Sequence, residues 1–339
     1  MYEAALPRLQ RRADLRQYTT ANSVDDFDEI RASLGYEKIN LRGGSYGTRS
    51  ALVYMRRHPD TIRSASLQGI QPISYRNPLP HARSAQNSLD LIFEEIRTTP
   101  RYAEAFENIE AKFQETLRRL EKEPANVPVL HPVTGEEQTI ILDRNAFAEA
   151  VRLQLYSMNS NRRLPLMLMR AHAGDYGELA QAALRQNRGA RGNIAWGMLM
   201  CVTGSEDISR IDSAEIAKAC SGTFLGEIRI RSQMAVAAIW PSGSVPESFG
   251  ELVNVDIPVL LFSGTHDPST APGWGADAAR HLPNSLHVVV PSGHGVSGPE
   301  VERLDQAFLD RGSVERLDLS EVEALTLPAL ALPETSKNQ

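Results

Sequence analysis

The sequence predicts an α/β protein whose parallel sheet is interrupted by a long, mainly helical insertion. Residues 38–57 have the pattern of a strand, a glycine-rich turn and a helix. Helical periodicity then dominates residues 75–240, and strands alternate with helices again over residues 259–312. Because a strand, a helix and a second strand in succession form a parallel βαβ unit, the two outer parts are expected to build one core. The predicted units are a first core part (1–74), a helical cap (75–240), a second core part (241–327) and a tail (328–339).

The first core part begins with a helix over about residues 20–34, which Gly35 ends. Its apolar stripe consists of Val24, Phe27, Ile30 and Leu34. A short strand at 38–42 leads through the glycine-rich turn into a helix at 48–57, and a second strand follows at 64–67. This spacing is that of a βαβ unit.

The insertion shows its clearest helical pattern between residues 102 and 120. Apolar residues recur there at three- and four-residue steps: Tyr102, Phe106, Ile109, Phe113, Leu117 and Leu120. Residues 127–130 and 139–142 flank a turn and predict a small hairpin. Helices are expected again at 144–156 and after Pro165.

The second core part resumes the α/β alternation. A buried strand is predicted at 259–262, a helix near 274–281 and a strand at 286–290. The last helix begins at Pro299 and ends at Gly312, which are favoured residues for those two positions. Beyond residue 327 we expect a frayed tail.

The composition is that of an ordinary globular protein and excludes several classes of function. Of 339 residues, 42% are hydrophobic and 23% charged, and the formal net charge of -6 offers no basic surface for nucleic acid. We expect neither a membrane span nor a signal peptide, because no suitable apolar stretch is present. Cys201 and Cys220 are too few for a metal cluster, and two buried free thiols are favoured over one bridge.

A candidate nucleophile lies in the glycine-rich turn after the first strand. The turn Gly43-Gly44-Ser45-Tyr46-Gly47 has the pattern G-x-S-x-G. A serine hydroxyl is a poor nucleophile, so it needs a nearby base and a turn that lifts it clear of the sheet. In such a turn the backbone N-H of Tyr46 becomes an oxyanion donor. Taken alone, the pattern also fits an ordinary glycine turn before a helix.

Two further residues follow late strands in the order that an α/β-hydrolase requires. Asp267 comes after the strand at 259–262, and His294 comes after the strand at 286–290. His294 would accept the Ser45 proton and return it to the leaving group, while Asp267 would fix the tautomer of His294. Separately, Asp267 could be a turn former and His294 an exposed loop residue. Their joint order favours a Ser45, Asp267 and His294 triad.

At these residues the chain resembles the proline iminopeptidase and tripeptidyl aminopeptidase family of α/β-hydrolases, including its TAP-like C-terminal region. The resemblance runs from about residue 15 to residue 327 and is carried by segments 18–20, 43–48, 264–268 with 274–275, and 287–291 with 294–295. It implies an α/β-hydrolase fold with a helical cap. It also implies a serine hydrolase that removes N-terminal residues from short peptides through an acyl-enzyme, without metal or cofactor.

The resemblance further implies a site for the substrate's amino group. The family holds this group with acidic cap residues, and Glu206-Asp207 within residues 204–208 is similar to that segment. An unpaired carboxylate near the pocket would select an ammonium group. The alternative is an exposed acidic pair at a helix start or in a solvated turn.

Two features depart from the family pattern. Family members carry strands and a His-Gly-Gly-Pro-Gly type oxyanion loop before the elbow, and no such motif precedes Ser45 here. We therefore expect an N-terminally incomplete sheet whose open edge, the strand at 38–42, can self-associate or pair with another chain. Gly204 stands where secreted relatives often have a cysteine, so disulfide-dependent secretion is not expected; relatives are often secreted or periplasmic, and the compartment is left open.

Two other functions remain open from the sequence. The same triad would hydrolyse esters, so a carboxylesterase acting on a small ester is the nearest alternative. The absent oxyanion motif favours a truncated, catalytically deficient module that depends on a partner. The expected ligands are a short peptide or a small amide or ester.

Overall fold

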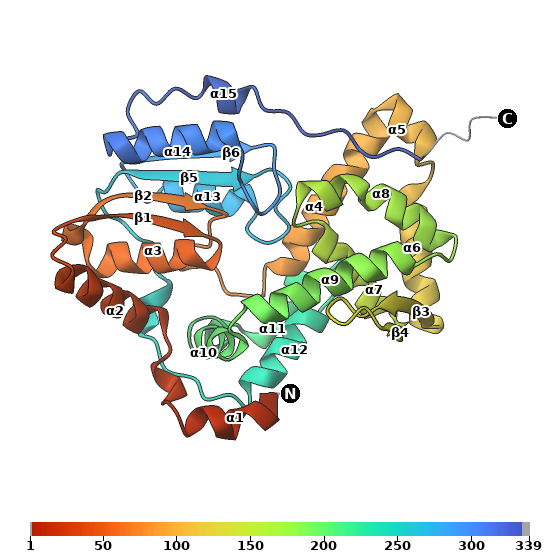
Figure 1. Ribbon diagram of the computed structural model, residues 1–339, viewed down its shortest axis with the longest axis horizontal. Helices are drawn as coiled ribbons and strands as arrows, with labels where there is room; N and C mark the ends of the chain where they lie inside the picture. The colour runs from red at the N-terminus through yellow and green to blue at the C-terminus, as the bar shows by residue number, and fades with distance from the viewer. Residues whose placement is uncertain (1, 334–339) are drawn as a thin grey trace.

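A four-stranded parallel sheet forms the centre of one lobe of the computed structural model, which describes residues 2–333 apart from the side chains of residues 188–193 (Figure 1). The strand order is β1-β2-β5-β6, with all neighbours parallel. The bounds are β1 Ile39–Gly44, β2 Ile62–Gln68, β5 Val259–Gly264 and β6 Ser285–Val290. Because β2 pairs directly with β5, the segments on either side of the insertion build one sheet. The predicted α/β architecture is confirmed.

Helices cover both faces of this sheet. Every residue of β5 is buried, and its side chains alternate between two cores. Val259 and Leu261 pack with helices α3 (Tyr46–Arg57) and α13 (Pro272–Ala279) on one face. Leu260 and Phe262 pack with α14 (Pro299–Arg311) on the other. A parallel strand covered on both faces is expected to be apolar throughout, as β5 is.

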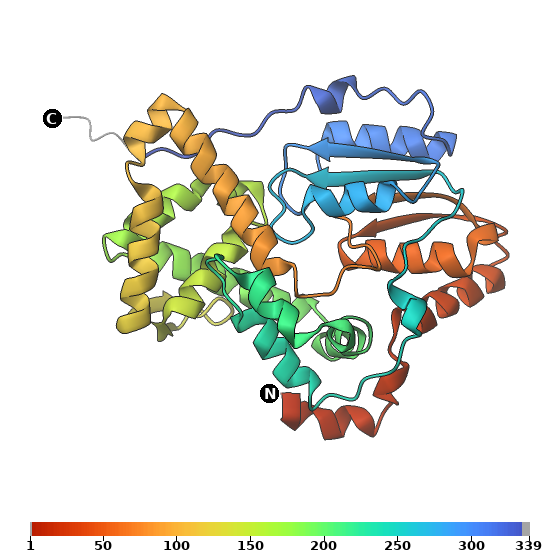
Figure 2. The same cartoon turned by 180° about the vertical axis from the view of Figure 1, so that it is seen from behind.

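The second lobe consists mainly of helices around a separate core (Figure 2). Its elements are α4 His81–Thr98, α5 Pro100–Ala105, α6 Ile109–Lys122, α7 Arg144–Gln154, α8 Met158–His172, α9 Gly177–Asn193, α11 Ser213–Cys220, α12 Ile228–Ala237, and an antiparallel hairpin of β3 Ala125–Leu130 and β4 Glu137–Leu142. The stripe predicted between residues 102 and 120 is buried here. It is divided between α5 and α6, because Asn108 between them has a left-handed backbone.

Helix α10 (Trp196–Glu206) lies between the two lobes in the ribbon view and packs against the N-terminal segment (Figure 1). That segment contains α1 (Tyr2–Gln10), which the sequence did not predict, and α2 (Thr20–Ser33). Cys201 of α10 is buried and free, as is Cys220, which confirms the prediction of two free thiols. The remaining short elements are α15 Ser320–Glu323 and four 3-10 turns at Leu15–Gln17, Pro59–Thr61, Ile208–Arg210 and Glu247–Gly250.

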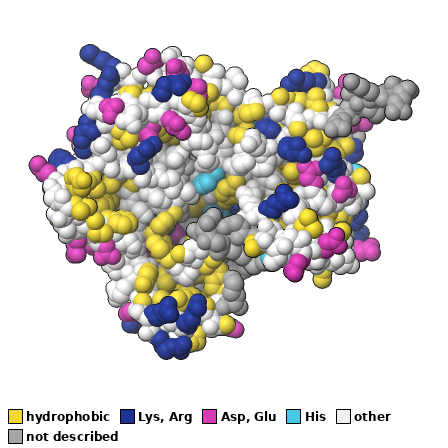
Figure 3. Space-filling model, in the orientation of Figure 1, with side chains coloured by type: hydrophobic (Ala, Val, Ile, Leu, Met, Phe, Trp, Pro, Cys, Tyr) yellow, Lys and Arg dark blue, Asp and Glu magenta, His cyan; other side chains and the backbone are white. Residues whose placement is uncertain are grey.

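The outer face of α2 is apolar and exposed. Of the predicted stripe only Val24 is buried, whereas Phe27, Ile30 and Leu34 are between 55% and 66% exposed. Helix α2 packs against α3, and apolar side chains gather on this part of the surface (Figure 3). The last strand at one side of the described sheet is β1. Self-association at this edge stays a prediction.

The C-terminal segment crosses from the sheet lobe to the helical lobe (Figure 1). Leu330 is buried, and its N-H donates to the Tyr102 hydroxyl at 3.1 Å. The Ala331 N-H donates to the Arg162 carbonyl at 2.9 Å. The prediction of a frayed tail is therefore wrong for residues 328–333, because an apolar side chain and two backbone donors find partners there. Residues 334–339 lie outside the described part of the chain.

The described residues contain no helix that is both long and apolar enough to span a membrane.

Candidate active site

Ser45 occupies a strained turn between β1 and α3. Its backbone has φ 52° and ψ -121°, in a region that non-glycine residues rarely adopt, and its N-H donates to the Gln68 carbonyl at 2.9 Å. A Cβ added to Gly43 would lie 2.6 Å from the Gly47 carbonyl oxygen. The turn is therefore so tight that the first glycine of G-x-S-x-G cannot carry a side chain. The result is a serine lifted clear of the sheet at the start of a helix.

Tyr46 is the first residue of α3, so its N-H has no acceptor within the helix. No hydrogen bond from this N-H is found in the described part of the chain. An N-H at this position points toward the space in front of the preceding Ser45 and carries the positive end of the helix dipole. Its predicted role as an oxyanion donor fits this placement and stays a hypothesis.

Asp267 follows β5 and is held by a dense set of hydrogen bonds. Its Oδ1 accepts from the backbone N-H groups of Ser269 and Thr270, each at 2.8 Å. Its Oδ2 accepts from the Thr270 hydroxyl at 2.7 Å and from His294 Nδ1 at 2.9 Å. Burial raises the pKa of Asp267, but the hydrogen bonds from His294 and Thr270 outweigh it, and the net shift is downward. The carboxylate is thus ionised and fixed in place.

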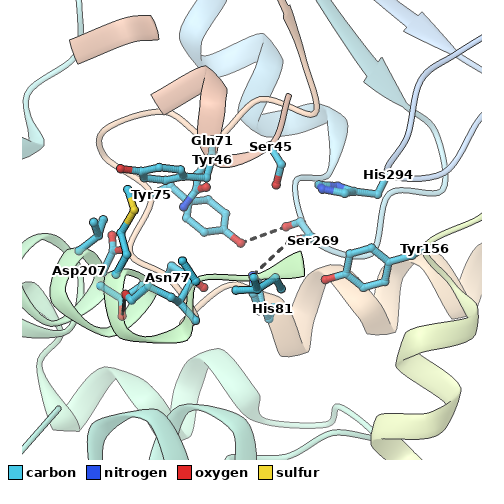
Figure 4. A pocket seen from close by; sticks show the side chains of 16 residues that line it. Ser45, Tyr46, Gln71, Tyr75, Asn77, His81, Tyr156, Asp207, Ser269 and His294 are labelled. Atoms are coloured by element: carbon cyan, nitrogen blue, oxygen red, sulfur yellow. Dashed lines mark hydrogen bonds between the residues drawn. The ribbon is translucent and has the colours of Figure 1, made fainter. Parts of the chain in front are cut away.

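His294 is oriented by its backbone, its ring face and its Nδ1. The His294 N-H donates to the Tyr156 carbonyl at 3.0 Å, and the two rings meet edge to face with centroids 5.2 Å apart. Because the ionised Asp267 can only accept, the proton of a neutral His294 must lie on Nδ1. The Nε2 lone pair is then free to act as a base. Figure 4 shows the ring directed toward the Ser45 hydroxyl.

Glycines allow the acid and histidine loops to approach closely. A Cβ on Gly264 would lie 1.9 Å from the Gly293 carbonyl oxygen. Gly69 has φ +63°, and a Cβ there would contact the His294 ring and the Thr270 hydroxyl at 3.4 and 3.2 Å. Side chains at either position would push the histidine loop away from the acid loop.

Ser45 and His294 line a cavity of about 400 Å³ in the hollow between the lobes (Figures 3 and 4). This volume lies within the range of small-ligand pockets. One wall is apolar and comes from the α10 region: Ile194, Ala195, Met198, Leu199 and Val202. The structure therefore brings the three predicted residues together, since Asp267 supports His294 from behind.

Both members of the acidic pair are buried, and only Asp207 faces the cavity. Glu206 does not line the cavity, and its two oxygens accept from the N-H and hydroxyl of Thr20 at 2.5 and 2.8 Å. Asp207 does line the cavity, and its Oδ1 lies 2.8 Å from Nη1 of the fully buried Arg49. Burial raises the pKa of both carboxyls, although Arg49 opposes it. The exposed-turn alternative is therefore wrong.

The Asp207 carboxylate has unused hydrogen-bonding capacity. Its Oδ1 lies 2.8 Å from Arg49 Nη1 and 3.7 Å from Arg210. Burial raises the pKa of Asp207, and hydrogen bonds from Arg49 and the Asn77 backbone lower it by less. An ionised carboxylate can accept about four hydrogen bonds. A carboxylate on a cavity wall that keeps lone pairs beyond its contact with Arg49 is therefore a candidate ligand site.

The sequence matches the model of a known protein family over most of its length. Residues 7–298 match the model of the alpha/beta hydrolase fold. The chain belongs to the α/β-hydrolase family.

Among α/β-hydrolases, serine protease Hip1 of Mycobacterium tuberculosis (strain ATCC 25618 / H37Rv) is 26% identical over 300 residues, covering 79% of this chain and 54% of that protein. The chain spans about half the length of this relative. Tripeptidyl aminopeptidase of Streptomyces lividans is 47% identical over 49 residues (14% of this chain, 9% of that protein). A probable proline iminopeptidase of Leptolyngbya boryana is 36% identical over 58 residues (17% and 18%). A solved esterase from Thermogutta terrifontis is 18% identical, with a TM-score of 0.35 over 87% of this chain and 74% of that one.

Several residues of this α/β-hydrolase site escaped the sequence reasoning. Thr270 could have been found, because a hydroxyl three residues after a predicted acid is placed to hydrogen-bond it. Arg49 is a charged residue on an otherwise apolar helix stripe, which is a weak signal of burial with a partner. His81 and Tyr156 come from the helical insertion, and only tertiary packing brings them to the cavity.

Proposed function

We propose that this α/β-hydrolase is a serine peptidase that removes residues from the free N-terminus of short peptides, in the manner of the proline iminopeptidase and tripeptidyl aminopeptidase group. The observation that carries the proposal is the buried Asp207 carboxylate on the wall of the cavity that holds Ser45 and His294. The names of the matched relatives, a serine protease and two aminopeptidases, support it.

In the proposed reaction His294 Nε2 removes the Ser45 proton as Oγ attacks the scissile carbonyl. The Tyr46 N-H stabilises the oxyanion, and the ionised Asp267 stabilises the imidazolium that forms. The imidazolium then protonates the leaving amine, which leaves an acyl-Ser45 ester. Water, deprotonated by His294, attacks that ester and regenerates the Ser45 hydroxyl.

Asp207 would receive the substrate's ammonium group in this scheme. Arg49 and Arg210 balance the formal charges of Glu206 and Asp207, so the acids can stay ionised together. The Asp207 carboxylate keeps lone pairs beyond its contact with Arg49, and an ammonium group supplies three donors. Glu206 is assigned no contact with substrate because Thr20 already occupies it.

The proposal is tested by comparing a dipeptide amide that has a free amine with its N-acetylated form. We expect kcat/KM to be at least tenfold higher for the free amine, since acetylation removes the charge that Asp207 would bind. Equal rates on both substrates would remove amine recognition from the account and leave a general hydrolase.

The apolar α10 wall favours a carboxylesterase as the second candidate, because it can hold an uncharged acyl chain. An esterase would hydrolyse a p-nitrophenyl alkanoate much faster than any aminoacyl amide and would be indifferent to a free amine. The same substrate pair, extended by such an ester, separates the two functions.

A further inference from the structure

A second serine and histidine pair faces the same cavity. Ser269 belongs to the loop that carries Asp267, and His81 is the first residue of α4. Ser269 Oγ lies 3.2 Å from His81 Nε2, both residues are more than nine-tenths buried, and both line the cavity with Ser45 (Figure 4).

The protonation of His81 follows from its partner Arg229. Arg229 Nε donates to His81 Nδ1 at 2.9 Å. An arginine Nε always carries its hydrogen, so His81 Nδ1 must be the acceptor and the single ring proton must lie on Nε2. Burial lowers the pKa of His81 well below its usual value, and the Arg229 charge adds to the effect. The ring is therefore neutral and donates through Nε2.

The two histidines thus present opposite groups to their serines. His294 has its Nδ1 proton bound by an acid and offers a lone pair at Nε2. His81 has its Nδ1 lone pair bound by a cation and offers a proton at Nε2. Consequently His81 cannot activate Ser269 as a nucleophile.

The Ser269 hydroxyl can donate a hydrogen bond into the cavity. Its Oγ accepts from His81, its N-H donates to Asp267, and its carbonyl accepts from the Tyr75 hydroxyl at 3.1 Å. Within the described residues the only side-chain hydrogen bond found for this hydroxyl is the one with His81, and the residue lines the cavity wall. A hydroxyl held in this way is an oriented donor.

The network behind this donor is fixed at its far end. Glu149 pairs with Arg229 at 3.2 Å and with Arg152 at 2.5 Å. Arg152 in turn donates to the hydroxyl of Tyr156, which also lines the cavity, at 2.7 Å. Arg229 is therefore held in position to set the His81 tautomer.

We propose that the Ser269 hydroxyl donates a hydrogen bond to a backbone carbonyl of the bound peptide, with His81 and Arg229 as positioning residues. The inference rests on the proposed peptidase function and names a second contact of the same site. A peptide offers carbonyl acceptors along its backbone, and these match the Ser269 donor. The cavity would then bind the substrate's amino group at Asp207 and its peptide backbone at Ser269.

Binding to an inactivated protein tests this without requiring turnover. The dissociation constant of a free-amine tripeptide amide is measured by calorimetry on Ser45→Ala and on Ser45→Ala with Ser269→Ala. We expect the second to bind about 3- to 10-fold more weakly, the effect of one hydrogen bond. Ser84→Ala, a buried serine of α4 that does not line the cavity, is the matched control and should bind like its parent. Unchanged affinity on loss of the Ser269 hydroxyl would overturn the proposal.

The tautomer provides a readout that a merely structural role would not change. In ¹⁵N spectra of histidine-labelled protein, His81 should be the Nε2-protonated form. Arg229→Met should allow the Nδ1-protonated form and weaken tripeptide binding, and Arg229→Lys, which keeps a donor, should restore both. An Nδ1-protonated His81 in the unaltered protein would refute the proposed positioning of Ser269 by His81 and Arg229. Failure of the peptidase proposal is distinguishable, because it would show as no tripeptide binding to Ser45→Ala itself.

Discussion

Asp267 and Asp207 are both buried beside one cavity, yet their surroundings have opposite effects. Asp267 accepts four hydrogen bonds, and these lower its pKa against the effect of burial. Asp207 also has a partner, the Arg49 guanidinium, but there burial prevails and raises the pKa. Burial alone therefore does not decide what a carboxylate does; the donors that its local backbone supplies do.

The two backbones explain the difference. The turn after β5 directs two N-H groups, those of Ser269 and Thr270, at the Asp267 carboxylate. Asp207 follows the last residue of α10, where helix carbonyls rather than N-H groups are unsatisfied. The same residue type thus supplies the proposed support for the catalytic base and the proposed receptor for a cation.

The largest expected effect is that of replacing the Asp267 carboxylate by an amide. Asp267→Asn keeps the shape but lets the side chain donate to His294 Nδ1, which favours the wrong tautomer. We expect kcat on a free-amine dipeptide amide to fall on the order of 10⁴-fold, with KM little changed. A loss below tenfold, measured at saturating substrate, would show that Asp267 does not serve His294.

Asp207→Asn should instead act on binding. Removing the charge should raise KM for the free-amine substrate on the order of 10- to 100-fold, because a buried charge pair is lost, and should leave the N-acetylated substrate unaffected. Glu206→Gln is the matched control: it should lower the melting temperature by weakening the Thr20 contacts and keep the preference for a free amine. If both variants lose the preference equally, the amine site belongs to the pair rather than to Asp207.

Thr270→Val probes one hydrogen bond of the Asp267 set. The substitution preserves volume and removes the donor to Oδ2, a charged hydrogen bond worth about 1.5–3 kcal/mol. We expect kcat to fall about 10- to 100-fold and fluorophosphonate labelling of Ser45 to slow in parallel. A Thr270→Ser variant should retain most of both rates; if it behaves like valine, packing rather than the hydroxyl is responsible.

The pH dependence of KM gives the smallest effect and the finest test. Because burial raises the pKa of Asp207, its carboxylate takes up a proton at a higher pH than an ordinary aspartate would. The affinity for a free-amine substrate should therefore fall, as pH is lowered, before Asp267 protonates, since the pKa of Asp267 is shifted downward. This rise in KM should be absent with the N-acetylated substrate and in Asp207→Asn. If KM rises in the same way in all three cases, a group other than Asp207 is responsible for the pH dependence.

The sequence predicted those parts of the site that depend on chain order. Ser45, Asp267 and His294 each follow a strand of one parallel sheet, so their meeting at one edge could be inferred from spacing. The state of Asp207 could not, because it depends on Arg49 of α3, which is far from it in the sequence.

Other features that the sequence did not predict also depend on packing between residues far apart in the chain. Leu330 is ordered by a slot in the helical lobe, and nothing in its local sequence indicates one. Phe27 and Leu34 form an amphipathic stripe, but periodicity does not say whether a partner covers it. His81 gains its role only through Arg229, far away in the chain.

The proposed triad is tested most directly by identifying the nucleophile. The protein is incubated with a fluorophosphonate and digested, and the adduct is located by mass spectrometry. We expect a single adduct on Ser45, lost in Ser45→Ala and strongly slowed in Asp267→Asn, with Ser269 unmodified because His81 cannot accept its proton. An adduct on Ser269 or on any serine other than Ser45, or no adduct on a folded protein, would contradict it.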